Sequence, residues 1–97
     1  MAKESDFQKD LIKELKTLFP GCIVMKNDAN YIQGIPDLLM LHNDKWAALE
    51  CKKSAKATKR PNQDYYVDKM DKMSFARIIY PNNKEEVLHE LQRSFKT

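Results

Sequence analysis

The chain has 97 residues and a formal net charge of +3, with 42% hydrophobic and 32% charged residues. This composition fits one folded domain over residues 1–97, and the mildly basic balance permits a nucleic-acid partner without demonstrating one. No apolar run approaches the length of a membrane span, and the charged N-terminus lacks an apolar signal segment, so we expect a cytoplasmic protein without a membrane partner. Cys22 and Cys51 lack metal-ligand spacing and are expected to be reduced thiols.

The first predicted element is a helix over residues 4–18. Its apolar side chains recur at helical spacing and form one stripe: Phe7, Leu11, Leu15 and Leu18. Pro20 and Gly21 come directly after this stripe and are expected to end the helix. The pattern therefore predicts an amphipathic helix that packs one face against a core.

Three strands are predicted next, over residues 22–26, 36–42 and 46–52. Residues 27–35 are rich in turn formers and are expected to form a loop, whereas a hairpin-like turn joins the last two strands. Alternation along the third strand puts four residues on one face: Trp46, Ala48, Glu50 and Lys52. The other face of this strand is apolar, so this strand is expected to be largely buried.

The rest of the chain predicts a helix over 61–74, a strand over 75–80 and a helix over 84–95. Met70 and Met73 recur at helical spacing and are expected to pack in the core. The resulting order is α-β-β-β-α-β-α. It predicts an α/β fold, a single small domain with a mixed central sheet flanked by helices.

Three charged residues occur in or beside these apolar strands. Glu50 and Lys52 lie two residues apart on one strand face, and Asp37 opens the neighbouring strand. Two carboxylates in a partly buried place repel each other, and a divalent cation relieves that repulsion. A lysine beside such a site can stabilise negative charge on a phosphate. The alternative interpretation is a structural Glu–Lys pair on an exposed sheet face.

A basic stretch follows directly, with four positive charges and no acid: Lys53, Lys56, Lys59 and Arg60. Such runs are usually solvated loops, but next to Glu50 and Lys52 this one can follow a phosphate backbone. Tyr31, in the loop that leads to Asp37, is a further candidate for contact with DNA. Gln63 lies near the start of the next predicted helix, where anions are favoured.

The stretches "KESDFQKDLIKEL", "GIPDLLML", "ALECKK" and "NQDYY" carry a family resemblance. The spacing of Asp37 and Glu50, thirteen residues apart with Lys52 after them, resembles the PD-(D/E)XK nuclease motif. The predicted α-β-β-β-α-β order is similar to the restriction-endonuclease-like core of that superfamily. Within it, the chain resembles the small stand-alone VRR-NUC domains of phages from Glu4 to about Tyr80.

This resemblance implies roles for individual residues. Asp37 and Glu50 would be metal ligands for Mg²⁺, with Mn²⁺ as a substitute, and the carbonyl of Cys51 would be a backbone ligand. Lys52 would take the position of the catalytic lysine. Gln63 matches a glutamine that positions the lysine, the water or the phosphate.

The resemblance also implies a helical acid that completes the acidic cluster, as a metal ligand and catalytic residue. Two candidates exist in the first predicted helix. Glu4 precedes Phe7 and Leu11 by three and seven residues, at the head of the buried stripe, and is the favoured one. Glu14 flanks the stripe and is expected at the surface.

The function implied is a Mg²⁺-dependent DNA endonuclease that selects branched or four-way-junction DNA by shape rather than by base sequence. A domain of this length offers little surface for base-specific readout. The resemblance to junction-resolving enzymes implies a homodimer, in the cytoplasm of a phage-infected bacterial host. Two alternatives remain open: a non-catalytic nucleic-acid-binding protein on a nuclease fold, and an unrelated α/β interaction module.

Overall fold

One four-stranded sheet flanked by three helices forms the fold in the computed structural model, which describes residues 3–57 and 62–96. The helices are α1 (Glu4–Leu18), α2 (Gln63–Met73) and α3 (Lys84–Phe95). The strands are β1 (Ile23–Lys26), β2 (Leu38–His42), β3 (Lys45–Cys51) and β4 (Ala76–Ile79). This is the predicted order of elements, so the α/β fold class and the mixed central sheet are confirmed.

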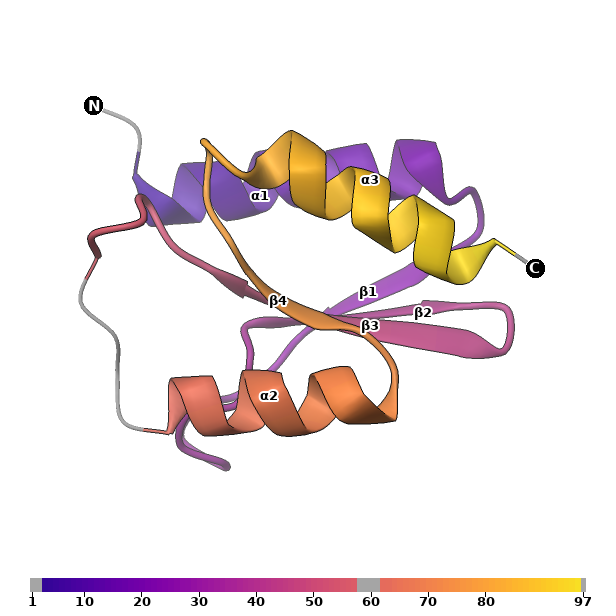
Figure 1. Cartoon of the computed structure of the whole chain (residues 1–97). Coiled ribbons are helices and arrows are strands. Elements are labelled where there is room, and N and C mark those ends of the chain that lie inside the picture. Colours follow the sequence, from indigo (N-terminus) through magenta and orange to yellow (C-terminus); the bar gives the residue numbers. More distant parts are fainter. Residues whose placement is uncertain (1–2, 58–61, 97) are drawn as a thin grey trace.

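The sheet has the strand order β1-β2-β3-β4. β1 and β2 pair antiparallel, as do β2 and β3, whereas β3 and β4 are parallel. A parallel pair needs a crossover connection, and α2 supplies it. α1 and α3 lie over one face of the sheet and α2 lies over the other (Figure 1). Among the described residues, none of the helices combines the length and apolar composition needed to cross a membrane.

The hydrophobic core lies between the sheet and the pair α1 and α3. It takes apolar side chains from both helices and from three strands: Leu11, Leu15, Phe19, Leu38, Met40, Ala47, Leu49, Cys51, Phe75, Ile79, Val87, Leu88 and Leu91. The stripe predicted for α1 contributes two fully buried members, Leu11 and Leu15. Burying such a continuous apolar surface is the main stabilising contribution in a domain of this size.

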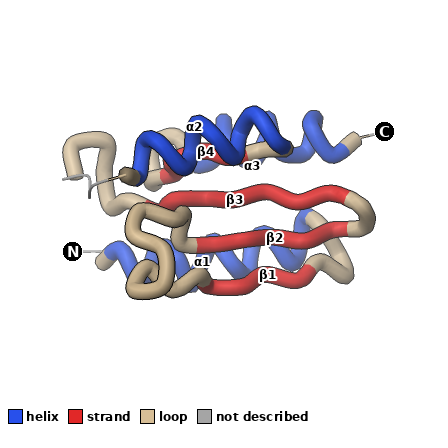
Figure 2. Tube along the Cα trace, turned by 90° about the horizontal axis from the view of Figure 1, so that it is seen from below, coloured by secondary structure: helices blue, strands red, loops and turns tan. Residues whose placement is uncertain are grey.

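The opposite face of the sheet is only partly covered. Strand pairing puts Ile23 beside Leu41 and Met25 beside Leu39, on the face away from α1. Ile23, Met25 and Leu41 are 57%, 43% and 36% exposed. Figure 2 shows that α2 runs beside β4 and β3 and leaves the β1 and β2 part of this face without a helix. These residues form what we call the apolar strip: Ile23, Met25, Leu39, Leu41 and Trp46.

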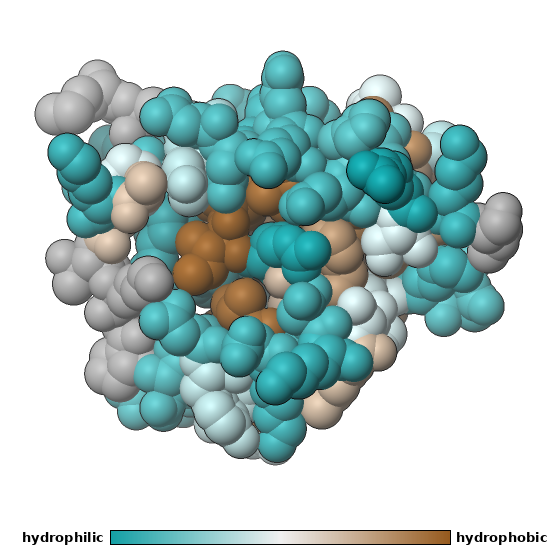
Figure 3. Space-filling model, in the orientation of Figure 1, coloured by the Kyte–Doolittle hydropathy of each residue, from teal (hydrophilic) through white to brown (hydrophobic). Residues whose placement is uncertain are grey.

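The outer edge of β4 is closed by side chains rather than by another strand. Asn83 accepts a hydrogen bond from the backbone N–H of Tyr80 and donates one to the carbonyl of Ile78. Asp71 accepts the N–H of Ala76 at 3.1 Å. Figure 3 shows a largely hydrophilic surface on this side, with apolar side chains gathered between α2 and the layer of α1 and α3. These caps occupy backbone groups with which another chain could otherwise pair.

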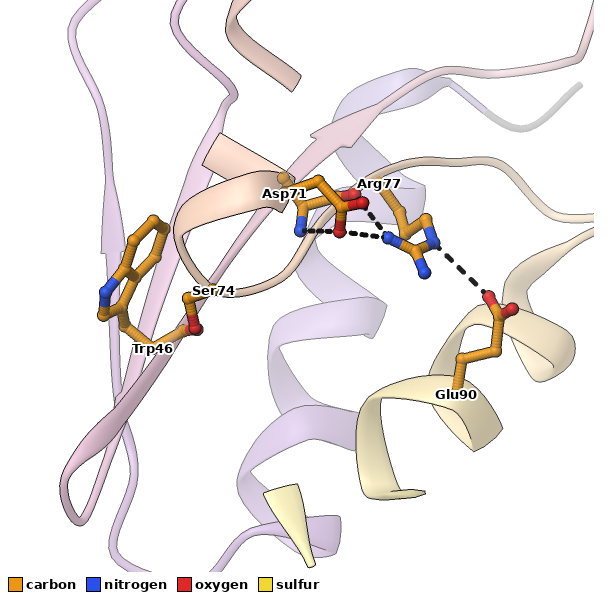
Figure 4. Close-up of polar contacts among 6 residues, drawn as sticks. Trp46, Asp71, Ser74, Arg77 and Glu90 are labelled. Atoms are coloured by element: carbon orange, nitrogen blue, oxygen red, sulfur yellow. Dashed lines mark hydrogen bonds and ion pairs between the residues drawn. The ribbon is translucent and has the colours of Figure 1, made fainter. Parts of the chain in front are cut away.

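An ion-pair chain connects α2, β4 and α3 (Figure 4). Asp71 of α2 pairs with Arg77 of β4, whose Nε lies 3.4 Å from Glu90 of α3. The Ser74 hydroxyl, at the end of α2, donates to the carbonyl of Trp46 in β3. These contacts fix the C-terminal end of α2 on the sheet, and so help to define where its N-terminal end lies.

The element bounds differ from the prediction mostly by one or two residues, and α1 and α3 match it. Met73 is a correction: it is 62% exposed rather than part of the core, because it lies on the outer side of the last turn of α2. The predicted start of that helix at residue 61 lies outside the described residues.

Asp71→Ala is expected to lower the free energy of unfolding by about 1 kcal/mol, because it removes the cap of the Ala76 N–H and a partner of Arg77. In a domain of this size that corresponds to a fall in Tm of roughly 4–8 °C, measurable by circular dichroism. Asp68→Ala, at an exposed position of the same helix, is the matched control. Equal losses in both variants would contradict this role of Asp71.

Candidate active site

The carboxylate of Glu50 is the centre of a buried polar cluster. Glu50 is 1% exposed, Lys52 5% and Gln63 2%. Glu50 Oε1 accepts the backbone N–H of Asp37 at 3.1 Å, and Oε2 accepts a hydrogen bond from Gln63 Nε2. Lys52 Nζ lies 3.6 Å from the same Oε2. The three side chains therefore form one network, as burial of a carboxylate requires.

The cluster lies where two elements meet at one end of the sheet. Glu50 is near the end of β3, and Lys52 follows that strand, with its N–H bonded to the carbonyl of Ile79 at 2.9 Å. Because strand side chains alternate, Glu50 and Lys52 point to the same face, toward α2. Gln63 is the first residue of α2, so Glu50 lies at a helix N-terminus, where the helix dipole favours a negative charge.

Asp37 is held opposite Glu50 by backbone contacts. Its N–H donates to Glu50, and its own Oδ2 accepts the N–H of Cys51 at 2.9 Å. Asn27 fixes the approach to this position: its backbone N–H donates to the carbonyl of Asp37 and its Nδ2 to the carbonyl of Pro36. The Glu50 carboxylate thus contacts the backbone of Asp37, just before β2, and the Asp37 carboxylate contacts the backbone of Cys51, at the end of β3.

Glu4, the first residue of α1, is electrostatically close to the same region. The pKa of the Cys51 thiol is raised to about 12, first by burial and then by the negative charges of Asp37, Glu50 and Glu4. A hydrogen bond from the side chain of Gln8 lowers this pKa. The thiol of Cys51 therefore lies within reach of the fields of all three acids.

Glu14, the second candidate for the helical acid, lies elsewhere. Its Oε2 is 2.9 Å from Lys84 Nζ of α3. Between the two candidates that the sequence leaves open, Glu4 is the one whose charge acts on the Cys51 thiol, next to Glu50 in the chain. Glu14 instead joins α1 to α3 by a partly exposed ion pair.

The donor set suits a hard cation in part. Among the described residues, no three His, Cys, Asp or Glu side chains gather closely enough to hold a metal ion. Asp37 and Glu50 supply two carboxylates, and the carbonyl of Cys51 lies on the same strand edge as its N–H, toward Asp37. Mg²⁺ accepts one or two carboxylates and keeps several waters. Asp37, Glu50 and the Cys51 carbonyl are therefore the groups here that could hold a hydrated Mg²⁺, with Glu4 outside that set.

The residues expected to contact nucleic acid are only partly described. Lys53 and Lys56 are exposed directly after the cluster, and Tyr31 is 85% exposed in the loop before β2. Lys59 and Arg60 lie outside the described residues. The basic stretch thus begins at the candidate site.

Two residues of this region are not found by sequence reasoning. Asn27 resembles any other turn former in its loop, and only its hydrogen bonds to Pro36 and Asp37 identify it as a support of the site. Gln8 lies one helical turn after Glu4. This spacing is the sequence feature that predicts Gln8 on the same face of the helix as Glu4.

Comparisons with protein-family models, with curated proteins and with solved structures found no match to this chain. The geometry of the cluster and the sequence motif are therefore the two arguments that bear on function.

Cys51 is expected to resist alkylation in the folded protein, because it is fully buried and its pKa is raised to about 12. At pH 8, N-ethylmaleimide should modify Cys22 and leave Cys51 unmodified until urea unfolds the chain, as read by mass spectrometry. The Cys22→Ser variant is the control and should take up no label when folded. Rapid labelling of that folded variant would contradict the placement of Cys51.

Proposed function

We propose that this protein is a metal-dependent endonuclease that hydrolyses phosphodiester bonds in DNA. The observation that carries the proposal is the buried cluster of Glu50, Lys52 and Gln63 with Asp37 opposite it. A buried ion pair is weak as a stabilising device, because desolvation offsets much of its attraction. Burying this pair beside a second carboxylate, at the end of a sheet, is better explained by chemistry than by stability.

Each residue has a definable task in this proposal. Asp37 and Glu50 bind Mg²⁺ or Mn²⁺ through carboxylate oxygens, with the carbonyl of Cys51. When bound, the cation supplies Lewis-acid stabilisation of the phosphate and lowers the pKa of a coordinated water. Lys52 stabilises negative charge that develops on the phosphate, and Gln63 holds Glu50 in position.

Glu4 and the basic residues complete the proposal. Glu4 extends the negative field of the cluster and holds a water or a second cation beside Asp37. Lys53, Lys56, Lys59, Arg60 and Tyr31 contact the substrate. The resemblance to junction-resolving nucleases favours branched or four-way-junction DNA as the substrate, recognised by shape and backbone.

Lys52→Ala is expected to lower the rate of Mg²⁺-dependent cleavage by about 10²–10³-fold, the typical effect of removing one charge-stabilising donor. The assay compares four-way junction, flap, linear duplex and single strand in Mg²⁺, Mn²⁺ and EDTA. Lys45→Ala is the matched control, because Lys45 lies at the other end of β3 and pairs only with Asp44 among the described residues.

Two further measurements make this test decisive. Asp37→Asn should abolish Mn²⁺ binding in calorimetry while the thermal melt remains cooperative. DNA binding without cleavage of any substrate by the wild-type protein would instead favour a non-catalytic nucleic-acid-binding protein. Absence of both would favour an unrelated α/β interaction module, in which Glu50 and Lys52 form a structural pair.

The same proposal includes a second copy of the chain as partner. The apolar strip supports it, because an exposed row of large apolar side chains across two strands is costly in water. A two-fold axis through such a strip pairs the same residues of both copies, which is the commonest way for identical chains to associate. No helix lies over the β1 and β2 part of this face, so a second sheet can pack there (Figure 2).

Met25→Glu is expected to convert this dimer into a monomer, because it puts a charge on the β1 side of the strip, beside Leu39. Sedimentation velocity at several concentrations measures the change. Met73→Glu is the matched control, since Met73 is also exposed but lies on α2, away from the strip. A wild-type chain that sediments as a monomer at every concentration would rule out this partner.

A further inference from the structure

A second basic surface lies along α1, away from the stretch that follows Lys52. It is an open groove between α1 and the end of β1, which we call the lysine groove. Its lining includes one apolar side chain, Ile12, and two residues of the first turn of α1, Ser5 and Asp6. The remaining lining residues are all lysines: Lys9, Lys13, Lys16 and Lys26.

The charge of the lysine groove is strongly positive. All four lysines are exposed, and no ion pair joins any of them to an acid of the described residues. Asp6, at the first turn of α1, is the one acid in the lining. Glu14 lies on another side of the same helix and is paired with Lys84 of α3. The like charges thus repel one another, and an anionic partner would relieve that repulsion.

The spacing of the lysines suits a polymer of phosphates. Lys9, Lys13 and Lys16 follow each other at intervals of four and three residues, on one side of α1. At a rise of about 1.5 Å per residue they extend over roughly 10 Å. Phosphates along one strand of a duplex recur about every 3.4 Å of axis, so this row of lysines covers about three of them.

Each wall of the groove includes a residue that is next in the chain to a residue in or beside the candidate site. On the α1 wall, Ser5 follows Glu4, whose charge acts on Cys51. On the β1 wall, Lys26 precedes Asn27, which donates hydrogen bonds to the carbonyls of Pro36 and Asp37. The groove and the cluster thus lie at the same end of the sheet but on opposite faces, since Glu50 and Lys52 point toward α2, so a backbone in the groove would reach the carboxylates by passing round that end of the sheet (Figure 1).

We propose that the lysine groove binds the sugar–phosphate backbone of a duplex arm that extends from the cleavage site. This inference rests on the proposed nuclease function for its choice of polyanion, since the groove lies at the same end of the sheet as a proposed site for phosphodiester chemistry. It assigns Lys9, Lys13, Lys16 and Lys26 to substrate binding, in addition to the stretch after Lys52. The substrate then has a duplex arm on the α1 side of the site, which is an added reason to expect branched DNA as the substrate.

The test compares two triple variants with the same net charge. Lys9→Gln, Lys13→Gln and Lys16→Gln together remove three charges from the groove. The control removes three lysine charges elsewhere, with Lys45→Gln, Lys72→Gln and Lys96→Gln. Glutamine is a good helix former, and the substituted lysines lie in helices or at the surface. Circular dichroism should therefore show the same folded content in both triple variants. Affinity is measured by fluorescence anisotropy with a labelled 20-base-pair duplex flap in EDTA, where no cleavage occurs.

The groove variant should bind the flap at least about tenfold more weakly than the control variant. Its slope of log affinity against log salt should fall by about 2–3, because each phosphate contact contributes about 0.9 to that slope. The inference would be overturned if both triple variants bound the flap equally weakly and with the same slope of log affinity against log salt. Absence of flap binding by the wild type would also overturn it. An equal loss on single-stranded DNA would overturn the assignment to a duplex arm.

The outcome is separable from that of the nuclease proposal. If the wild type cleaves no substrate but the groove variant alone loses affinity, the nuclease proposal fails and the groove assignment stands. If the wild type cleaves in Mg²⁺ and both triples bind alike, the groove assignment fails and the nuclease proposal stands.

Discussion

The burial of one carboxylate, that of Glu50, constrains the whole end of the sheet. A charge so fully removed from water is tolerated only when its oxygens are satisfied and a positive charge lies near. Here the donors are the Asp37 N–H, Gln63 and Lys52, which come from three different segments. Each segment must therefore take one position, because moving any of them leaves Glu50 buried and short of a partner. The features useful for chemistry and the features that fix the local structure are the same contacts.

This constraint explains why α2 is held at both ends. Its first residue reaches Glu50, while Asp71 and Ser74, near its C-terminal end, bond to β4 and β3. A helix of 11 residues, about 16 Å long, can lie only along the strands that it connects. α2 therefore covers β3 and β4 and leaves β1 and β2 without a helix on that face (Figure 2). The uncovered apolar strip is thus a consequence of how the site is built.

The sequence predicts those features that depend on local periodicity. The helix over residues 4–18 and the shared face of Glu50 and Lys52 follow from spacings of 3.6 and 2, and both agree with the structure. It does not identify features that depend on which elements become neighbours. Asn27 supports the site only because β1 ends beside the start of β2. Helical spacing predicts a core position for Met73, because it identifies a common face of the helix but not where along the helix the contact with the sheet ends.

β1 separates the two surfaces proposed for partners. Its side chains alternate, so Ile23 and Met25 join the apolar strip, whereas Lys26 turns to the α1 side and lines the groove. A second copy packed on the strip would therefore lie on the opposite face of the sheet from the lysine groove. Both grooves of such a dimer would remain open to a polyanion, because neither groove lies on the face that carries the strip. Association of two copies and binding of a duplex arm are then compatible, because one short strand keeps the two surfaces apart.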